Sequence, residues 1–353
     1  MSQPLIIAAF SLIFLLSFSV CLFGFIISRR VILERRKVHF DRVYGEIEED
    51  VLEAISRLDS DFTLGIAQKY IHQPAVLTQA LLDFGDVIIG EGREQLKIIF
   101  NRAIRSRCLK GVASRRATKR LRSVRLFIIF FDPAESDFLF RLLDDKPIIK
   151  LAVINALSRV PTPETMRYIF RAFEEDSGAA VQAYFNIMFG LGNRIEPFVW
   201  SFLNKPLSAA KLGLLVELVG AIPLRALYED ILPLAAHPDK EIRIRVARAL
   251  GKLLIDETVD TLVTLSSDEA WEVKAQAVKS LGQMKNLRTL DILEASLFSP
   301  SWFVRHNAGY GLAEMGEEGL RRLKKVAAQE VDRYARDMSV MVLNELILTA
   351  EAA

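Results

Sequence analysis

Apolar and polar positions repeat along the chain with a period of about 31 residues. The pattern is plainest in three ten-residue blocks: 242–251 reads IRIRVARALG, 273–282 reads VKAQAVKSLG and 304–313 reads VRHNAGYGLA. In each block position 2 is Lys or Arg, positions 5, 6 and 8 are small or aliphatic, and position 9 is Leu. Because positions 1, 5, 8 and 9 share one face of an α-helix, each block predicts one amphipathic helix.

The same block extends in both directions along the chain. Its starts fall at 149, 181, 211, 242, 273, 304 and 335, and 76–85 fits as an earlier copy. Before each later block lie a second apolar segment and a turn with Pro, Asp, Gly or Ser, as at His237-Pro238-Asp239. Such residues end one helix and cap the next. The sequence therefore predicts stacked helical hairpins, an all-α solenoid of about 8–9 two-helix repeats.

Two features of the block predict how neighbouring hairpins meet. Small residues at positions 6 and 10 allow a neighbouring helix to approach closely. The basic residue at position 2 follows the turn, so we expect it to pair with an acid of the turn, such as Asp239 or Asp268; a ladder of cations for ligand binding is the alternative. Position 2 is basic at Lys150, Arg243, Lys274, Arg305 and Arg336.

At the N-terminus the pattern changes to an unbroken apolar run. Leu5 to Ser28 contains 24 residues without a charge, and a helix of that length is about 36 Å long, enough to cross a hydrocarbon core of about 30 Å. The run has no charged residue before it and no small-x-small site at its end, which favours a retained transmembrane anchor over residues 1–28 rather than a cleaved signal peptide. Arg29, Arg30 and further basic residues follow. We therefore expect a single-pass protein of the cytoplasmic (inner) membrane, with the N-terminus outside and the repeat domain in the cytoplasm.

The remaining chain divides by pattern into a stalk and a repeat domain. Residues 29–62 are amphipathic at helical spacing and predict a stalk helix. The solenoid is expected over 63–350, with its clearest repeats in 134–350 and a basic, irregular region at 101–131.

Within that region, 101–125 contains ten Lys or Arg and no acid. So dense a cluster attracts phosphate, anionic lipid or an acidic partner, whereas a solvated face paired with acids elsewhere in the fold is the structural alternative. Nucleic acid is disfavoured because no aromatic residue lies between the cations to stack on bases. The candidate patch comprises Arg102, Arg105, Arg107, Lys110, Arg115, Arg116, Lys119, Arg120, Arg122 and Arg125.

A second candidate surface is aromatic. Trp271 and Trp302 occupy equivalent positions 31 residues apart, just before the block helix. With Phe303 and Tyr310, and with His306 between them, they predict a cluster along the edge of the stack. Packing between helices is one interpretation, and a row of exposed aromatic partner contacts is the other.

Composition and motifs exclude several classes of chemistry. The chain has 353 residues, of which 51% are hydrophobic and 25% charged, so it can bury a core. The two cysteines and four histidines are scattered and form neither a disulfide framework nor a metal-ligand pattern. Nucleotide-binding and hydrolase motifs such as GxxxxGK[ST], GxGxxG, GxSxG and HExxH do not occur. We therefore predict no catalytic residues, no cofactor and no metal.

The VRxxAAxALG block after a short Pro/Asp turn, on a 31-residue period, resembles the short HEAT-like repeats of bacterial proteins, a class also found in phycobilin lyases. The resemblance covers roughly Leu64 to Leu348. It implies a right-handed superhelix in which the stacked second helices line a concave surface that holds partners.

These patterns lead to one main functional hypothesis and its rivals. The main hypothesis is a non-catalytic scaffold that binds a protein partner, such as a membrane-associated enzyme or assembly, at the cytoplasmic face. A bilin lyase-like enzyme, implied only by the resemblance, is the first alternative. A helical-repeat protein that binds lipid or nucleic acid through 101–125 is the second.

Overall fold

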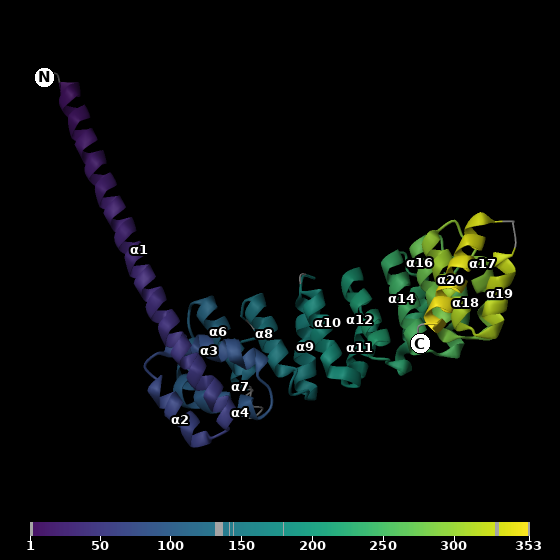
Figure 1. Cartoon of the computed structure of the whole chain (residues 1–353), viewed down its shortest axis with the longest axis horizontal. Coiled ribbons are helices and arrows are strands. Elements are labelled where there is room, and N and C mark those ends of the chain that lie inside the picture. The colour runs from purple at the N-terminus through teal and green to yellow at the C-terminus, as the bar shows by residue number, and fades with distance from the viewer. Residues whose placement is uncertain are drawn as a thin grey trace. The chain divides into compact units, whose positions relative to one another are not determined.

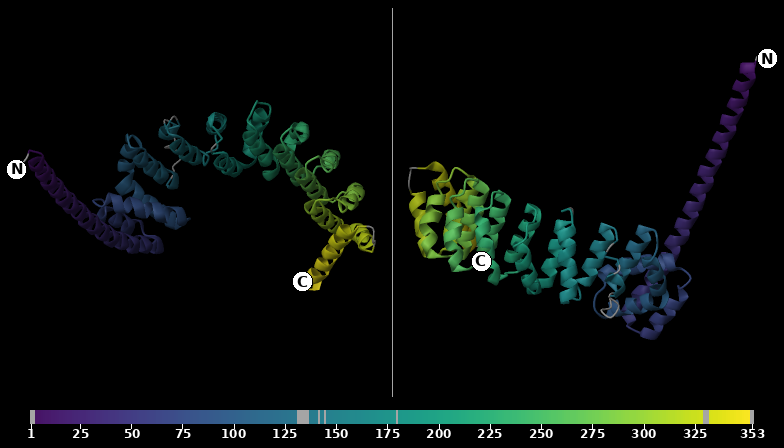
Figure 2. Two further views of the ribbon diagram at one scale, coloured as in Figure 1. Left: turned by 90° about the horizontal axis from the view of Figure 1, so that it is seen from above. Right: turned by 180° about the vertical axis from the view of Figure 1, so that it is seen from behind.

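The computed structural model describes residues 3–130, 137–140, 142–143, 145–178, 180–328 and 332–351, and their regular structure is entirely helical. The chain divides into two compact units, Met1–Ala156 and Leu157–Ala353. Each unit is described by itself below, and Figures 1 and 2 follow the helices in chain order.

Unit 1 is a cluster of helices around an apolar core. Ile47 and Val51 of the first helix pack with Leu81, Leu96 and Phe100 at its centre. Asp59 caps the second helix by accepting hydrogen bonds from the amides of Asp61 and Phe62. The helices are α1 (Gln3–Arg57), α2 (Ser60–Lys69), α3 (Pro74–Val87), α4 (Glu91–Ile99), the π-helix η1 (Phe100–Ile104), α5 (Arg105–Val112), α6 (Ala117–Ile129), α7 (Asp137–Phe140) and α8 (Pro147–Leu157).

Helix α1 corrects the prediction of a transmembrane anchor. It runs without a break through the apolar segment and the charged segment that follows (Figure 1). Side chains at 3–17 lie outside the described residues. Among the described residues, no helix has both the length and the apolar character that a membrane crossing requires. The charged segment begins at Arg29 and Arg30, and the same helix continues through it to Arg57. The predicted membrane-spanning helix, and with it the predicted single-pass localisation in the cytoplasmic membrane, is therefore wrong.

Unit 2 consists of helical hairpins in sequence, as the 31-residue period predicts. Each ten-residue block forms the second helix of a hairpin, and the apolar segment before it forms the first helix, often with a 3-10 turn (η) at its start. The first helices are α9 (Pro163–Glu175), α11 (Glu196–Leu203) after η3 (Gly192–Ile195), α13 (Tyr228–Ile231) between η4 (Arg225–Leu227) and η5 (Leu232–Ala236), α15 (Val259–Leu265) after η6 (Asp256–Thr258), α17 (Leu290–Ser296) after η7 (Leu287–Thr289), and α19 (Glu317–Ala327). The second helices are α10 (Val181–Leu191), α12 (Ala209–Ala221), α14 (Lys240–Leu253), α16 (Trp271–Met284), α18 (Trp302–Glu314) and α20 (Arg333–Glu351).

The second helices pack on one another in chain order, α12 on α14, α14 on α16 and α16 on α18 (Figure 2). Glycine at position 10 of one block faces a small residue at position 8 of the next. A Cβ at Gly220 would stand 2.6 Å from Cα of Ala249, and one at Gly282 would stand 2.6 Å from Cα of Gly311. Position 10 is thus confirmed as the point of close approach. Its partner at position 8 is a feature that the block alone did not reveal.

The basic residue at position 2 joins one turn to the next. Arg243 is buried and donates from Nη1 to the carbonyl oxygens of His237 and Pro238 in its own turn, at 2.8 and 3.1 Å. Its Nε and Nη2 form a bidentate pair with Asp268 of the following turn, at 2.7 and 2.9 Å. Arg305 repeats the contacts to its own turn, with Ser299 and Pro300. The structural role of position 2 is therefore confirmed for Arg243, although its acid partner belongs to the next turn rather than to its own. Arg305 bonds carbonyl oxygens of its own turn and, among the described residues, not the acid that was predicted.

Candidate functional site

The aromatic cluster, which we define as Trp271, Trp302, Phe303, His306 and Tyr310, lies on two neighbouring second helices of unit 2. The ring of Trp271, at the start of α16, stacks on Phe303 of α18 with centroids 5.1 Å apart. Trp302 meets Phe303 edge-on at 5.2 Å, and His306 stands between Trp302 and Tyr310, at 4.7 and 4.5 Å. The cluster therefore joins two repeats and then follows one face of α18.

The cluster contributes to packing and also remains open to solvent. Trp271, Trp302 and Phe303 are 45%, 48% and 54% exposed. At the far end, the Tyr310 hydroxyl donates to the carboxylate of Glu345 on α20, and this hydrogen bond raises the pKa of the tyrosine. Aromatic rings that are held by one another and yet half-exposed give a rigid apolar surface, which is the type of surface that binding sites for proteins use.

The repeat positions explain why the cluster is confined to these helices. Trp271 and Trp302 are the first residues of α16 and α18. The equivalent first residue of α14 is Lys240, which forms an ion pair with Glu272 at 2.5 Å. The first position of the second helix thus takes part in a salt bridge in one repeat (Lys240 with Glu272) and in a stacked aromatic pair in the next (Trp271 with Phe303).

The basic stretch folds as η1, α5 and α6 of unit 1, and the structure separates its cations into groups. Arg120 forms a bidentate pair with Asp145, with both distances 2.6 Å, and also donates to the carbonyl of Ser114 at 2.7 Å. Arg125 pairs with Asp86. Arg102, Arg115 and Arg116 are exposed and lie outside the cleft described next.

Arg120 reveals a further copy of the repeat contact. The spacing from Arg120 to Asp145 equals that from Arg243 to Asp268, and each arginine also bonds a carbonyl six residues before it. Helix α6 is thus built like a second helix, with Arg120 at position 2 of a block that starts at 119. This spacing identifies the copy only once the pair of Arg243 with Asp268 is known from the structure.

Four of the predicted cations line one cleft of about 680 Å³ between α3, α5 and α6. Arg107 and Lys110 reach it from α5, and Lys119 and Arg122 from α6. The lining also includes the hydroxyls of Thr78, Ser106 and Ser123, with Pro74 and Ala75 from the first turn of α3. We refer to it as the basic cleft.

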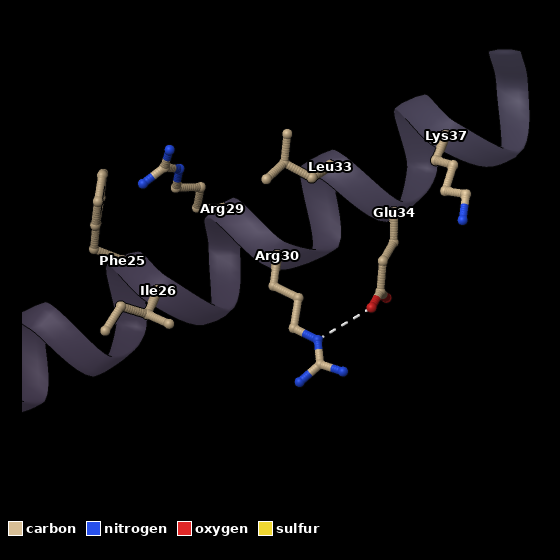
Figure 3. Close-up of a pocket in the computed structure, with 7 residues that line it drawn as sticks. All are labelled: Phe25, Ile26, Arg29, Arg30, Leu33, Glu34 and Lys37. Atoms are coloured by element: carbon tan, nitrogen blue, oxygen red, sulfur yellow. Dashed lines mark hydrogen bonds and ion pairs between the residues drawn. The ribbon is translucent and has the colours of Figure 1, made fainter. Parts of the chain in front are cut away.

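A second hollow, of about 410 Å³, lies on α1 (Figure 3). The residues that line it come from one helix, and Arg30 and Glu34 form an exposed ion pair at 3.1 Å along it. Because no second element encloses it, this is a gap between side chains on a helix surface, and it offers no site for chemistry.

The described residues give no support for metal or thiol chemistry. They contain no group of three or more His, Cys, Asp or Glu that could hold a metal ion. The two cysteines are free, Cys21 exposed and Cys108 buried, and burial raises the pKa of the Cys108 thiol to about 11. A thiol with that pKa is almost entirely protonated at neutral pH and is a poor nucleophile.

Comparison with known proteins agrees with this architecture. Residues 228–313 match the family of HEAT repeats. No curated protein matches the chain in sequence. Among solved structures, importin beta superposes with a TM-score of 0.52 at 13% identity, over 83% of this chain and 47% of the importin chain. An engineered protein superposes with a TM-score of 0.40 at 14% identity, and the match covers 84% of this chain and 98% of the engineered chain. YibA of Escherichia coli superposes with a TM-score of 0.43 at 16% identity, and the match covers 68% of this chain and 92% of the YibA chain.

The chain therefore has the fold of a HEAT-like, all-helical repeat solenoid, as the block pattern predicts. It spans about half the length of importin beta. At these identities the likeness defines the fold, and function has to be argued from this chain's own surfaces.

Proposed function

We propose that the protein is a non-catalytic scaffold that binds a protein partner through the aromatic cluster of unit 2. The observation that carries the proposal is the half-exposure of Trp271, Trp302 and Phe303, which stack across two neighbouring repeats. Large rings exposed in one place are costly to leave in water, and Trp is among the residues that contribute most to protein interfaces. The expected partner presents a short apolar segment that covers the rings.

The rigidity of the cluster supports the same proposal. Each ring is held by a neighbouring ring, and α16 and α18 are fixed together by the contact between Gly282 and Gly311. A surface that is already ordered loses little conformational entropy when a partner binds. Its residues sit on helices rather than on loops, which keeps their spacing constant.

Site-specific cross-linking tests the proposal. A photoreactive phenylalanine analogue placed at position 303 of the full chain should yield one discrete cross-linked protein in the source cells. The same analogue at Leu287, an equally exposed apolar residue on the first-helix side, should not give that product. The product should disappear when Trp271 and Trp302 are both changed to Ala. Identical products from both positions, or a product that survives the double substitution, would contradict the proposal.

A further inference from the structure

We propose that the basic cleft of unit 1 is a binding site for a ligand that carries two linked phosphate groups. This site is separate from the aromatic cluster, and its occupant would be a small anion rather than a protein. The argument rests on the charge of the lining, the amides of α3 and the geometry of η1.

The lining is strongly positive and contains no compensating acid. Arg107, Lys110, Lys119 and Arg122 are all exposed, and no Asp or Glu lines the cleft. Within the described residues, Arg122 bonds only the neutral side-chain oxygen of Gln79, at 2.8 Å. Four cations match two linked phosphate groups, because one phosphate group carries about −1.5 to −2 charges at neutral pH.

Helix α3 adds neutral donors at the same place. Its N-cap residue, Gln73, makes no side-chain cap, and Pro74 at the first helical position has no amide hydrogen. The first amide of α3 that forms a helical hydrogen bond is that of Leu77, to the carbonyl of Gln73. The amide of Ala75, in the cleft lining, is therefore available to an anion, and the positive end of the helix dipole points the same way.

The π-helix explains how the two cations of α5, Arg107 and Lys110, come to face the cleft. In a π turn each residue bonds one position further back than in an α-helix, so the following residues are rotated by about 100° relative to an uninterrupted helix. The turn at Phe100–Ile104 stands between α4, which buries Leu96 and Ile99, and α5, which brings Arg107 and Lys110 into the cleft. π-helices of this kind are frequent at functional sites.

The size and lining of the basic cleft fit a small anion and offer no recognition of a nucleobase. Its volume of about 680 Å³ is within the range of small-molecule sites, about 300–1,000 Å³. It has no aromatic side chain on which a nucleobase could stack. The hydroxyls of Thr78 and Ser106 can bond phosphate oxygens, so recognition is directed at the phosphate groups.

Titration calorimetry of the full chain with inorganic pyrophosphate tests the proposal. We expect micromolar binding at moderate salt, at least tenfold tighter than that of citrate, an anion of similar charge built from carboxylates. The K119Q/R122Q variant should lose at least tenfold in affinity. The control variant R115Q/R116Q removes the same charge from exposed residues that do not line the cleft and should stay within about twofold of the wild type. A parallel titration with ADP distinguishes free pyrophosphate from a diphosphate group that belongs to a larger molecule. If ADP binds as tightly as pyrophosphate, the site accepts the diphosphate of a larger molecule. If ADP does not bind, the site takes the free anion.

Lysine acetylation footprinting provides a second measurement that needs no variant. Pyrophosphate should protect Lys110 and Lys119 from acetylation and leave the exposed Lys252 of unit 2 unchanged. Equal losses of affinity in the two double variants, equal binding of citrate, no binding of pyrophosphate at millimolar concentration, or uniform protection of all three lysines would each overturn the proposal.

Discussion

Replacement of glycine by alanine at position 10 of a block should have opposite effects on stability in two different repeats of unit 2. Gly282 of α16 faces the backbone of Gly311, whereas Gly190 of α10 holds the same position and has no heavy atom within 4 Å of a built Cβ. The difference follows from position 8 of the next block, which is Gly311 in α18 and Leu218 in α12. A bulky residue there keeps the helices further apart.

The magnitudes follow from two competing effects. Alanine in a helix interior is favoured over glycine by about 0.8–1.0 kcal/mol. Gly190 lies one residue before the end of α10, so this term acts alone but not at its full interior value, and Gly190→Ala should stabilise unit 2 by up to about that amount. At Gly282 the added carbon would lie 2.6 Å from a backbone Cα, about 1 Å inside normal van der Waals contact. Relief of such an overlap requires a backbone shift, with a cost of about 1–3 kcal/mol, so Gly282→Ala should destabilise by up to about 2 kcal/mol.

Urea unfolding of the full chain, followed by circular dichroism, measures both changes. The midpoint should rise for Gly190→Ala and fall for Gly282→Ala, and the double variant should show the sum because the two sites are far apart in sequence and share no partner. A thermal scan should show a shift of about 2–4 °C per kcal/mol for a unit of this size. A stabilising effect at Gly282 would refute the argument that α16 and α18 meet through their backbones.

Three further predictions concern buried groups. Arg243→Met should destabilise unit 2 by about 3–5 kcal/mol in urea unfolding, because it leaves Asp268 buried without its partner. Arg120→Met should have a comparable effect on unit 1, because Arg120 pairs with Asp145 in the same way. Burial by itself raises the pKa of Asp268, but the hydrogen bonds from Arg243 and an amide outweigh it and hold this pKa below its ordinary value of 3.8. The pair therefore contributes stability that is complete above pH 3.8 and is lost as the pH falls through the lowered pKa, and acid unfolding of D268N should lack this component. Native protein at pH 8 should react with Ellman's reagent at Cys21 only, and Cys108 should react after unfolding; rapid reaction of two thiols in the native state would contradict the burial of Cys108.

The block pattern predicted the repeats well because helices and turns are determined largely by residues close together in the sequence. Apolar positions at helical spacing, turns with Pro and Asp, and a constant period specify which residues form each hairpin. The close approach at position 10 was also predictable, because glycine in a helix is costly unless a neighbour needs the space. The same sequence did not show that Asp268, one turn ahead, is the partner of Arg243, since spacing alone does not tell which of two turns lies within reach.

The remaining differences arise where the chain departs from its period. The apolar count over 5–28 predicted a membrane span, but α1 continues through the charged segment from Arg29 to Arg57, and no helix of the described residues meets the requirements for a membrane crossing. The basic cleft was not predicted, because the block pattern did not indicate the π turn at Phe100–Ile104, which sets the face that α5 turns toward the cleft. Arg120 was included in the candidate patch as a surface cation, yet it holds a half-buried ion pair like that of Arg243.

The central claim, that the aromatic cluster binds a protein partner, is tested most directly by an affinity measurement with the partner that position 303 cross-links. The dissociation constant should be measured by calorimetry for the wild type, for W302A and for the control L287A. The account predicts at least a 30-fold weaker affinity for W302A, equivalent to about 2 kcal/mol as for a central interface residue, and a change of less than twofold for L287A. Equal affinities for W302A and the wild type would contradict it.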